Sequence, residues 1–243
     1  MSAERQAQAQ LAAVVCGTGL LGQALVARLQ QAGLWIITID SPTMAVLPDV
    51  RLALHGDITA EEAWQSFANA IRLSNILPSL LAFTTDLNDN AVALLELAQA
   101  EWDHMLNHHV RAAYLGCKYL FPLMQAPAAT VLSASTLGAW DTRPDAGALT
   151  ASSGGILALS RTLALNGAAL GIRVNTVCYD LAPSTHRDNQ NLIARIPLGR
   201  PTTSEDVVNA MLFFLSDDAS YLTGSSLIVD GGQSLQSWSN APA

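Results

Sequence analysis

The sequence predicts a single α/β domain, a doubly wound parallel sheet with helices on both faces, and three observations support this. Short apolar runs alternate with longer amphipathic segments, the order typical of strand–helix–strand units. The apolar runs lack strict alternation of apolar and polar residues, which indicates strands buried on both sides. No internal repeat or linker divides the 243 residues, so we expect one domain over 1–243 with its core at about 11–235.

The predicted elements follow one another in regular order. The first strand is expected at 11–16, and the first helix, 21–32, ends before Gly33, which suits a left-handed helix end. Right-handed crossovers between the strands then give the doubly wound arrangement. The other predicted strands are 35–40, 50–54, 77–84, 130–134, 173–178 and 226–229. The other predicted helices are 101–124, 148–169 and 205–215, with one more beginning after Thr59.

Composition limits the classes of partner. The net charge of −8 repels phosphate backbones, so we expect no nucleic acid. The apolar runs are too short to span a bilayer, and residues 1–10 lack the pattern of a signal peptide. The three cysteines lack metal-ligand spacing and are typical of buried thiols in a reducing compartment. We therefore expect a cytoplasmic protein without a metal or a membrane partner.

A glycine-rich loop follows the first strand and opens the first helix. Gly17, Gly19 and Gly22 form G-x-G-x-x-G, in which the glycines allow a tight turn, close approach of a pyrophosphate, and packing of helix on strand. Asp40 ends the second strand, where an acid can bind the adenosine ribose and repel a 2′-phosphate. The pattern predicts a Rossmann-type dinucleotide site that prefers NAD to NADP. The same residues can also persist as fold scaffolding alone.

Later segments resemble motifs of the short-chain dehydrogenase/reductase family. They read GIRVN at 171–175, PLGR at 197–200, SEDV at 204–207, SDDASYLTG at 216–224 and VDGG at 229–232. The segment GDIT at 56–59 resembles the family turn whose Asp approaches the adenine. The resemblance runs from about residue 11 to 235. The cofactor-binding positions that it implies are Gly17, Gly19, Leu21, Gly22, Asp40, Asp57 and Ile58.

The resemblance also exposes two substitutions. In this family a tyrosine transfers the hydroxyl proton, and a lysine one helical turn later lowers its pKa and holds the nicotinamide ribose. The segment LTASSGG at 149–155 resembles the family's Y-x-A-S-K-G-G, which puts Leu149 and Ser153 at these two positions. Leucine cannot move a proton and serine carries no charge. The resemblance therefore implies no catalytic residue at either position.

Other family positions carry polar residues with open roles. His109 stands at the asparagine position, either as a base or as a polar group that bonds to the backbone. Ser135 and Thr136 straddle the serine position. Tyr179 is either a proton donor or an aromatic residue that fills the vacated pocket. The segment 114–118 matches Y-x-x-x-K, but it lies mid-helix, so we do not expect a catalytic pair there.

Three functions remain open. The first is a non-catalytic subunit that assembles with an active homologous dehydrogenase, by analogy one of hydroxyacyl-CoA type, or with itself, as a dimer or tetramer. The second is an NAD-dependent oxidoreductase in which His109, Thr136 or Tyr179 is the acid/base. The third is a dinucleotide-binding sensor. We expect NAD binding to be weak or absent, because the ribose-binding lysine is missing and Leu20 and Leu21 crowd the loop.

Two predicted helices carry the expected assembly surface. Apolar and small residues on them exceed what one face against the sheet requires, so we expect burial against equivalent helices of another subunit. These residues are Val110, Ala113, Tyr114, Cys117, Tyr119, Phe121, Ile156, Leu157, Leu159 and Leu163.

Overall fold

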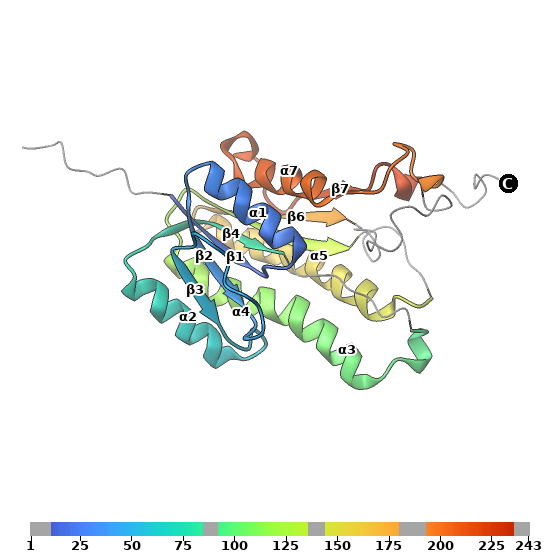
Figure 1. The fold of residues 1–243 in the computed structure, drawn as a ribbon, viewed down its shortest axis with the longest axis horizontal. Helices are drawn as coiled ribbons and strands as arrows, with labels where there is room; N and C mark the ends of the chain where they lie inside the picture. Colours follow the sequence, from blue (N-terminus) through green and yellow to red (C-terminus); the bar gives the residue numbers. More distant parts are fainter. Residues whose placement is uncertain (1–10, 85–91, 136–143, 180–192, 236–243) are drawn as a thin grey trace, which may run out of the picture.

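A computed structural model describes residues 11–84, 92–135, 144–179 and 193–235. They form a seven-stranded sheet in the order β3-β2-β1-β4-β5-β6-β7, and every pair of neighbouring strands is parallel (Figure 1). The strands are β1 (Ala12–Cys16), β2 (Trp35–Asp40), β3 (Leu52–His55), β4 (Pro78–Phe83), β5 (Ala128–Ser135), β6 (Ile172–Tyr179) and β7 (Ser226–Val229). The predicted doubly wound α/β fold is confirmed.

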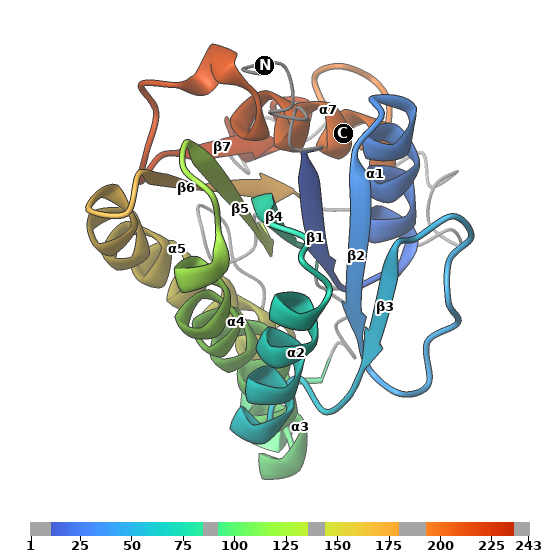
Figure 2. The same ribbon diagram turned by 90° about the vertical axis from the view of Figure 1, so that its left-hand side faces the viewer.

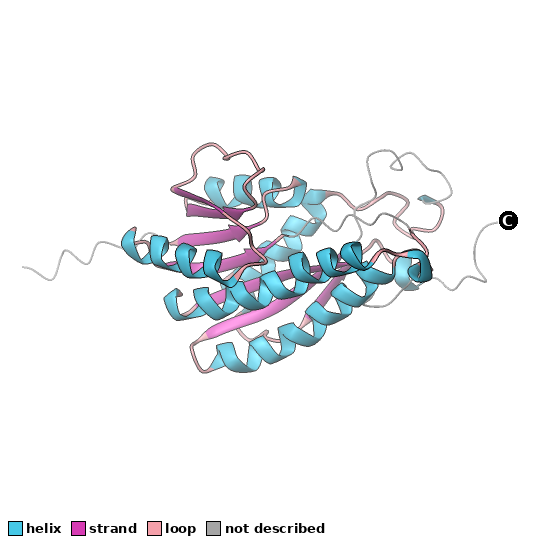
Figure 3. Cartoon of the chain, turned by 90° about the horizontal axis from the view of Figure 1, so that it is seen from below, coloured by secondary structure: helices cyan, strands magenta, loops and turns pink. Residues whose placement is uncertain are grey.

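Helices cover both faces of the sheet (Figure 2). One face packs against α1 (Leu20–Gln31) and α7 (Ser204–Leu215) through an apolar core cluster. The other face packs against α2 (Glu61–Leu73), α4 (Ala112–Leu120) and α5 (Gly147–Ala168), and Figure 3 shows this side. Strands buried on both sides explain the continuous apolar runs of the sequence. The three cysteines are buried without disulfides, as expected.

The predicted helix 101–124 is interrupted. It consists of α3 (Gln99–Leu106), a π-helical turn (Asn107–Arg111), α4, and a 3-10 turn (Phe121–Leu123). His109 is the one buried residue of the π-helical turn. Its ring bonds to β5 and α5, and π-turns often occur where a helix must aim one side chain. Periodicity alone does not reveal such a turn.

Helix α5 is the one helix of the described ranges that is long and apolar enough to cross a membrane. It has 22 residues, and 44% of its most apolar window is buried inside the protein. It packs on β5 and β6, and a core helix of this kind passes the same test of length and composition. The feature is therefore weak evidence for a membrane, and the cytoplasmic location stays a prediction.

Candidate functional site

The candidate site lies at the carboxyl edge of the sheet. Since the strands are parallel, β1, β2, β4, β5 and β6 all end at this edge, and their arrows point the same way in Figure 1. Ligands of open α/β sheets bind outside the carboxyl ends of the strands. The glycine loop, Asp40, Ser135 and Tyr179 all lie at these strand ends.

Two glycines of the loop are required by its geometry. Gly17 has φ +94°, and a Cβ there would lie 2.9 Å from the Thr84 carbonyl oxygen. A Cβ on Gly22 would lie 1.9 Å from the Gly17 carbonyl oxygen. The Thr84 hydroxyl donates to that same Gly17 oxygen at 2.5 Å, so the end of β4 supports the loop from below. The tight turn requires glycine at both positions, because neither has room for a side chain.

The N-terminus of α1 fits an anionic group. Gly19 is its N-cap, and no side chain of the described residues caps it. The first N–H groups of a helix have no partner within the helix, and together with the helix dipole they attract phosphate. Gly17, Gly19 and Gly22 are therefore the residues that would hold a pyrophosphate.

Asp40 is held by the loop itself. The Thr18 backbone N–H donates to Asp40 Oδ1 at 3.1 Å, and the Thr18 hydroxyl donates to Asp40 Oδ2. Asp40 is 6% exposed and Thr18 is 2% exposed. Burial raises the pKa of Asp40, while the hydrogen bonds from Thr18 oppose that shift. The carboxylate that the sequence assigns to the ribose thus already has donors on both oxygens.

The other predicted cofactor residues hold local structure. Asp57 Oδ1 accepts from the Thr59 N–H at 2.9 Å and from the Thr59 hydroxyl at 2.6 Å, and these bonds lower the pKa of Asp57. The Ile58 carbonyl accepts from Trp64 Nε1 at 2.8 Å. Both contacts shape the turn that leads into α2. Leu21 is 1% exposed and lies on the side of α1 that packs into the core, so the expectation that it crowds the loop was wrong. Leu20, at 70% exposed, faces solvent.

The two residues that the motif resemblance puts at the family's tyrosine and lysine positions are buried. Leu149 is 2% exposed and packs with Ala146 and Met105. Ser153 is fully buried, and its hydroxyl oxygen accepts the Ser135 N–H at 3.0 Å. Thr136 lies outside the described residues. Neither Leu149 nor Ser153 offers an ionisable group to this edge of the sheet.

His109 joins three elements through its ring. Nε2 lies 2.9 Å from the Ser133 carbonyl oxygen on β5, and Nδ1 lies 3.0 Å from the Ser152 hydroxyl on α5. Burial lowers the pKa of His109 to about 4, so the ring is neutral near pH 7. A carbonyl can only accept, so we assign the proton of the neutral ring to Nε2. Nδ1 then faces the Ser152 hydroxyl, whose single proton is shared between Nδ1 and the Leu149 carbonyl oxygen, which lies 3.0 Å from it. The sequence left His109 open between base and backbone partner, and its contacts are those of the second role.

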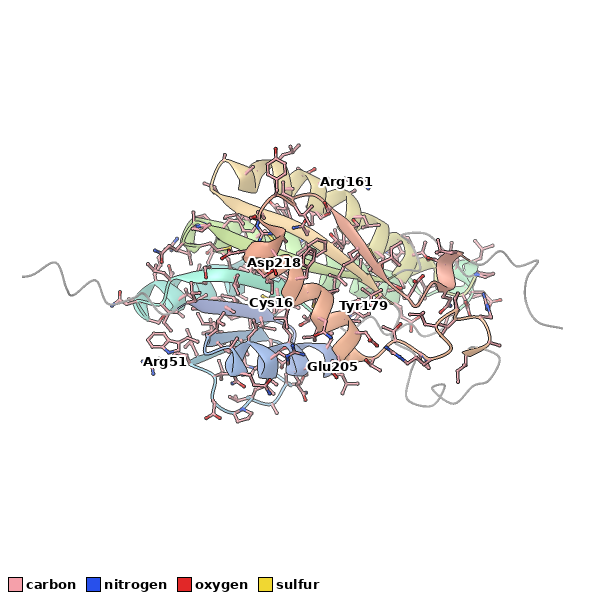
Figure 4. All side chains as sticks on the ribbon, turned by 90° about the horizontal axis from the view of Figure 1, so that it is seen from above. Cys16, Arg51, Arg161, Tyr179, Glu205 and Asp218 are labelled. Atoms are coloured by element: carbon pink, nitrogen blue, oxygen red, sulfur yellow. The ribbon has the colours of Figure 1, made fainter. Side chains whose placement is uncertain are left out.

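The two tyrosines considered from the sequence, Tyr179 and Tyr114, lie in different environments. Tyr179 is 3% exposed and packs in the core cluster under α1 and α7, the side seen in Figure 4. Tyr114 is 46% exposed on α4. Lys118, which follows it, pairs with Glu61 of α2 at 2.5 Å. The Y-x-x-x-K match therefore joins α4 to α2 and does not serve the carboxyl edge.

A cavity of about 720 Å³ lies at the opposite edge of the sheet. Leu11, Ala128 and Ile172, at the amino ends of β1, β5 and β6, line it with neighbouring residues, and it includes none of the predicted site residues. Within the described ranges no group of three His, Cys, Asp or Glu side chains could hold a metal. The described residues therefore offer no metal site of this kind.

Known proteins resemble the chain over most of its length. An uncharacterized short-chain type dehydrogenase/reductase, y4vI of Sinorhizobium fredii, is 28% identical over 94% of this chain, which spans 44% of that relative. The 4-formylbenzenesulfonate dehydrogenase TsaC1/TsaC2 of Comamonas testosteroni is 29% identical over 93% of this chain and 98% of its own.

A solved structure is also similar. It is a short chain oxidoreductase from Pseudomonas aeruginosa PAO1 described as containing an atypical catalytic center, with a TM-score of 0.83 and 25% identity over 93% of this chain and 98% of that one. An NADPH-bound structure with the same description, from the same organism, has a TM-score of 0.81 and 25% identity over 94% of this chain and 99% of that one. The family model for enoyl-(acyl carrier protein) reductases matches residues 21–234. With the motifs and the fold, this match means that the chain belongs to the short-chain dehydrogenase/reductase family of oxidoreductase folds.

Proposed function

We propose that the chain is a non-catalytic subunit that assembles with an active homologous dehydrogenase and supports it. The carrying observation is the pair Leu149 and Ser153 at the family's tyrosine and lysine positions. Leu149 is packed in an apolar cluster, and the Ser153 hydroxyl is bonded to the backbone of Ser135. A hydride transfer from an alcohol or to a ketone needs a partner for the hydroxyl proton, and these residues supply none.

The proposed role keeps a weak dinucleotide site. Gly17, Gly22 and the N-terminus of α1 suit a pyrophosphate. No lysine stands at position 153 to hold the nicotinamide ribose. The bound dinucleotide would carry the hydride when present, and the protein residues would only bind and orient it.

The purified chain should bind NAD(H) more tightly than NADP(H), and both weakly. The Asp40 carboxylate lies at the end of β2, where its charge disfavours a 2′-phosphate. Isothermal titration calorimetry with the four nucleotides measures this order. Tighter binding of NADP(H) than of NAD(H) would contradict it.

The expected assembly surface is smaller than the sequence suggested. Several residues assigned to it are buried in the chain's own core, namely Ala113, Cys117, Phe121, Ile156 and Leu157. Each of these lies on the side of its helix that faces the sheet or a neighbouring helix. The outer side of α4 and α5 still carries Tyr114, at 46% exposed, and Leu165, at 80% exposed. Exposed Thr162 and Ala158 lie one and two helical turns before Leu165, and small residues permit close approach of a second helix.

A test of assembly follows from this surface. The chain should form a dimer or tetramer, alone or with a co-expressed family member that has an intact tyrosine and lysine, and light scattering measures the mass. The proposal expects an obligate interface of roughly 2,000 Å² or more. Leu165→Glu should reduce the assembly to monomers, because a buried unpaired charge is costly.

The matched control is Leu73→Glu, which changes an equally exposed leucine (85%) at the end of α2. It should leave the mass unchanged. A stable monomer at micromolar concentration, unchanged on co-expression, would rule out the subunit role.

A second candidate function has one specific observation in its favour. The similar Pseudomonas aeruginosa oxidoreductase is described as containing an atypical catalytic center. By analogy, this chain would be an oxidoreductase with substituted catalytic groups. Of the residues considered for the acid/base role, the structure describes His109 and Tyr179. An assay of turnover by the isolated chain separates the two functions.

A further inference from the structure

The contact between Thr18 and Asp40 bears on how the chain recognises a dinucleotide. Thr18 lies between Gly17 and Gly19 in the loop, and Asp40 ends the neighbouring strand β2. We infer that Thr18 restricts dinucleotide binding by occupying the carboxylate that would otherwise accept the adenosine ribose hydroxyls. This inference rests on the dinucleotide site of the proposed function and not on the proposed partner.

Both carboxylate oxygens are involved. The Thr18 N–H donates to Oδ1 at 3.1 Å, and its hydroxyl donates to Oδ2. Each oxygen can accept more than one hydrogen bond, but Asp40 is only 6% exposed. A ribose diol therefore meets a carboxylate that is largely covered and already bonded, and it must displace the threonine hydroxyl to bind in full.

Neighbouring contacts hold Thr18 in place. Gln23 Nε2 donates to the Thr18 carbonyl at 3.0 Å, so the first turn of α1 holds the residue from its other side. The Gly17 N–H donates to the Ile39 carbonyl at 3.0 Å, which ties the loop to β2 next to Asp40. Because the backbone on both sides of the contact is hydrogen-bonded, the Thr18 main chain is held next to Asp40.

The two ends of the site thus differ. The pyrophosphate end keeps its glycines and the uncapped start of α1, whereas the ribose end is closed by the chain's own hydroxyl. Removing only that hydroxyl leaves Asp40 Oδ2 without its donor, and a 2′- or 3′-hydroxyl of NAD can replace it. NADP gains nothing although it keeps its 3′-hydroxyl, because the 2′-phosphate beside that hydroxyl is repelled by the negative charge of Asp40.

The test is calorimetric titration of the full chain with NAD and with NADP. Thr18→Ala keeps the backbone N–H but removes the hydroxyl and frees the space beside the carboxylate. It should tighten NAD binding about tenfold or more, the effect of one hydrogen bond to a charged group, and leave NADP unchanged. Thr18→Val, whose second methyl group still covers part of the carboxylate, should give a smaller gain, and Thr18→Ser, which keeps the hydroxyl, should bind like the parent chain. Adding Asp40→Ala to Thr18→Ala should abolish the gain.

Thr203→Val is the matched control. It removes another threonine hydroxyl bonded to an aspartate, 2.7 Å from Asp206 Oδ2 at the start of α7, and should not change the affinity for NAD. Thermal unfolding without nucleotide shows whether each variant is folded. Equal or weaker NAD binding by both folded Thr18→Val and Thr18→Ala overturns the inference while the dinucleotide site stands. An equal gain for NADP overturns it too, because the loop would then merely have opened. Absence of binding in parent and variants overturns both the inference and the dinucleotide site.

Discussion

The purified chain is expected to show no NAD(H)-dependent oxidation of alcohols or reduction of ketones above background. A positioned general acid or base contributes about 10²–10⁴-fold to such a reaction. The resemblance of segment 149–155 to the family motif implies that this group is replaced by Leu149, whose side chain is 2% exposed among apolar neighbours. Ser153 carries no charge, so it cannot lower the pKa of a neighbouring hydroxyl as the family's lysine lowers that of the tyrosine. We therefore expect a loss at least as large as this factor relative to an active family member.

Absorbance of NADH at saturating nucleotide measures the rate, with cyclic alcohols, ketones and hydroxyacyl-CoA compounds as substrates. An active dehydrogenase of the family, assayed in parallel, shows that the conditions support turnover. A rate from the isolated chain that disappears in Tyr179→Phe or in folded His109→Ala would refute the non-catalytic role. It would establish the oxidoreductase with substituted groups instead.

The sequence predicted the sheet closely because burial on both faces leaves a plain signal. The strands 35–40 and 226–229 were predicted with the bounds that the structure has, and Gly33 lies after α1 with φ +81°. A strand in the middle of a parallel sheet, such as 35–40, is apolar along most of its length, and a left-handed helix end favours glycine. Both demands act on adjacent residues, so they can be read directly from the chain.

The site was harder to predict because its contacts join residues far apart in sequence. Thr18 and Asp40 are 22 positions apart, and the glycine pattern does not tell which way the carboxylate turns. A hydroxyl residue within the glycine loop, facing an acid at the end of the next strand, is the signal that could have suggested the contact.

Helix faces were misjudged for a related reason. Ala113, Cys117 and Phe121 are buried because α4 packs against α2 and α5 as well as the sheet. A helix with neighbours on several sides needs more than one apolar stripe. Its apolar residues therefore overstate the surface that is left for a second subunit.

His109 is expected to make the stability of the fold depend on pH between about 6.5 and 4. Burial lowers its pKa from 6.5 to about 4 in the folded chain. Between these values the unfolded chain binds a proton that the folded chain does not, so the free energy of unfolding falls as the pH falls. The shift corresponds to about 3 kcal/mol over the whole window, fully lost by about pH 4, below which both states are protonated.

Chemical denaturation at several pH values between 7.5 and 4.5 measures this dependence. His109→Asn should lower stability at pH 7.5, where the imidazole contacts with Ser133 and Ser152 are intact, and should remove the slope between pH 6.5 and 4.5. His55→Asn is the control, because the His55 ring is exposed and the variant should keep the slope. Carboxylates such as Asp206, whose pKa is lowered by Arg200, lose their stabilising contribution only as the pH falls further, so they affect parent and variants alike. If His109→Asn kept the full slope, the buried neutral imidazole would not be its source, and the role of His109 as a bond between β5, α5 and the π-helical turn would have to be abandoned.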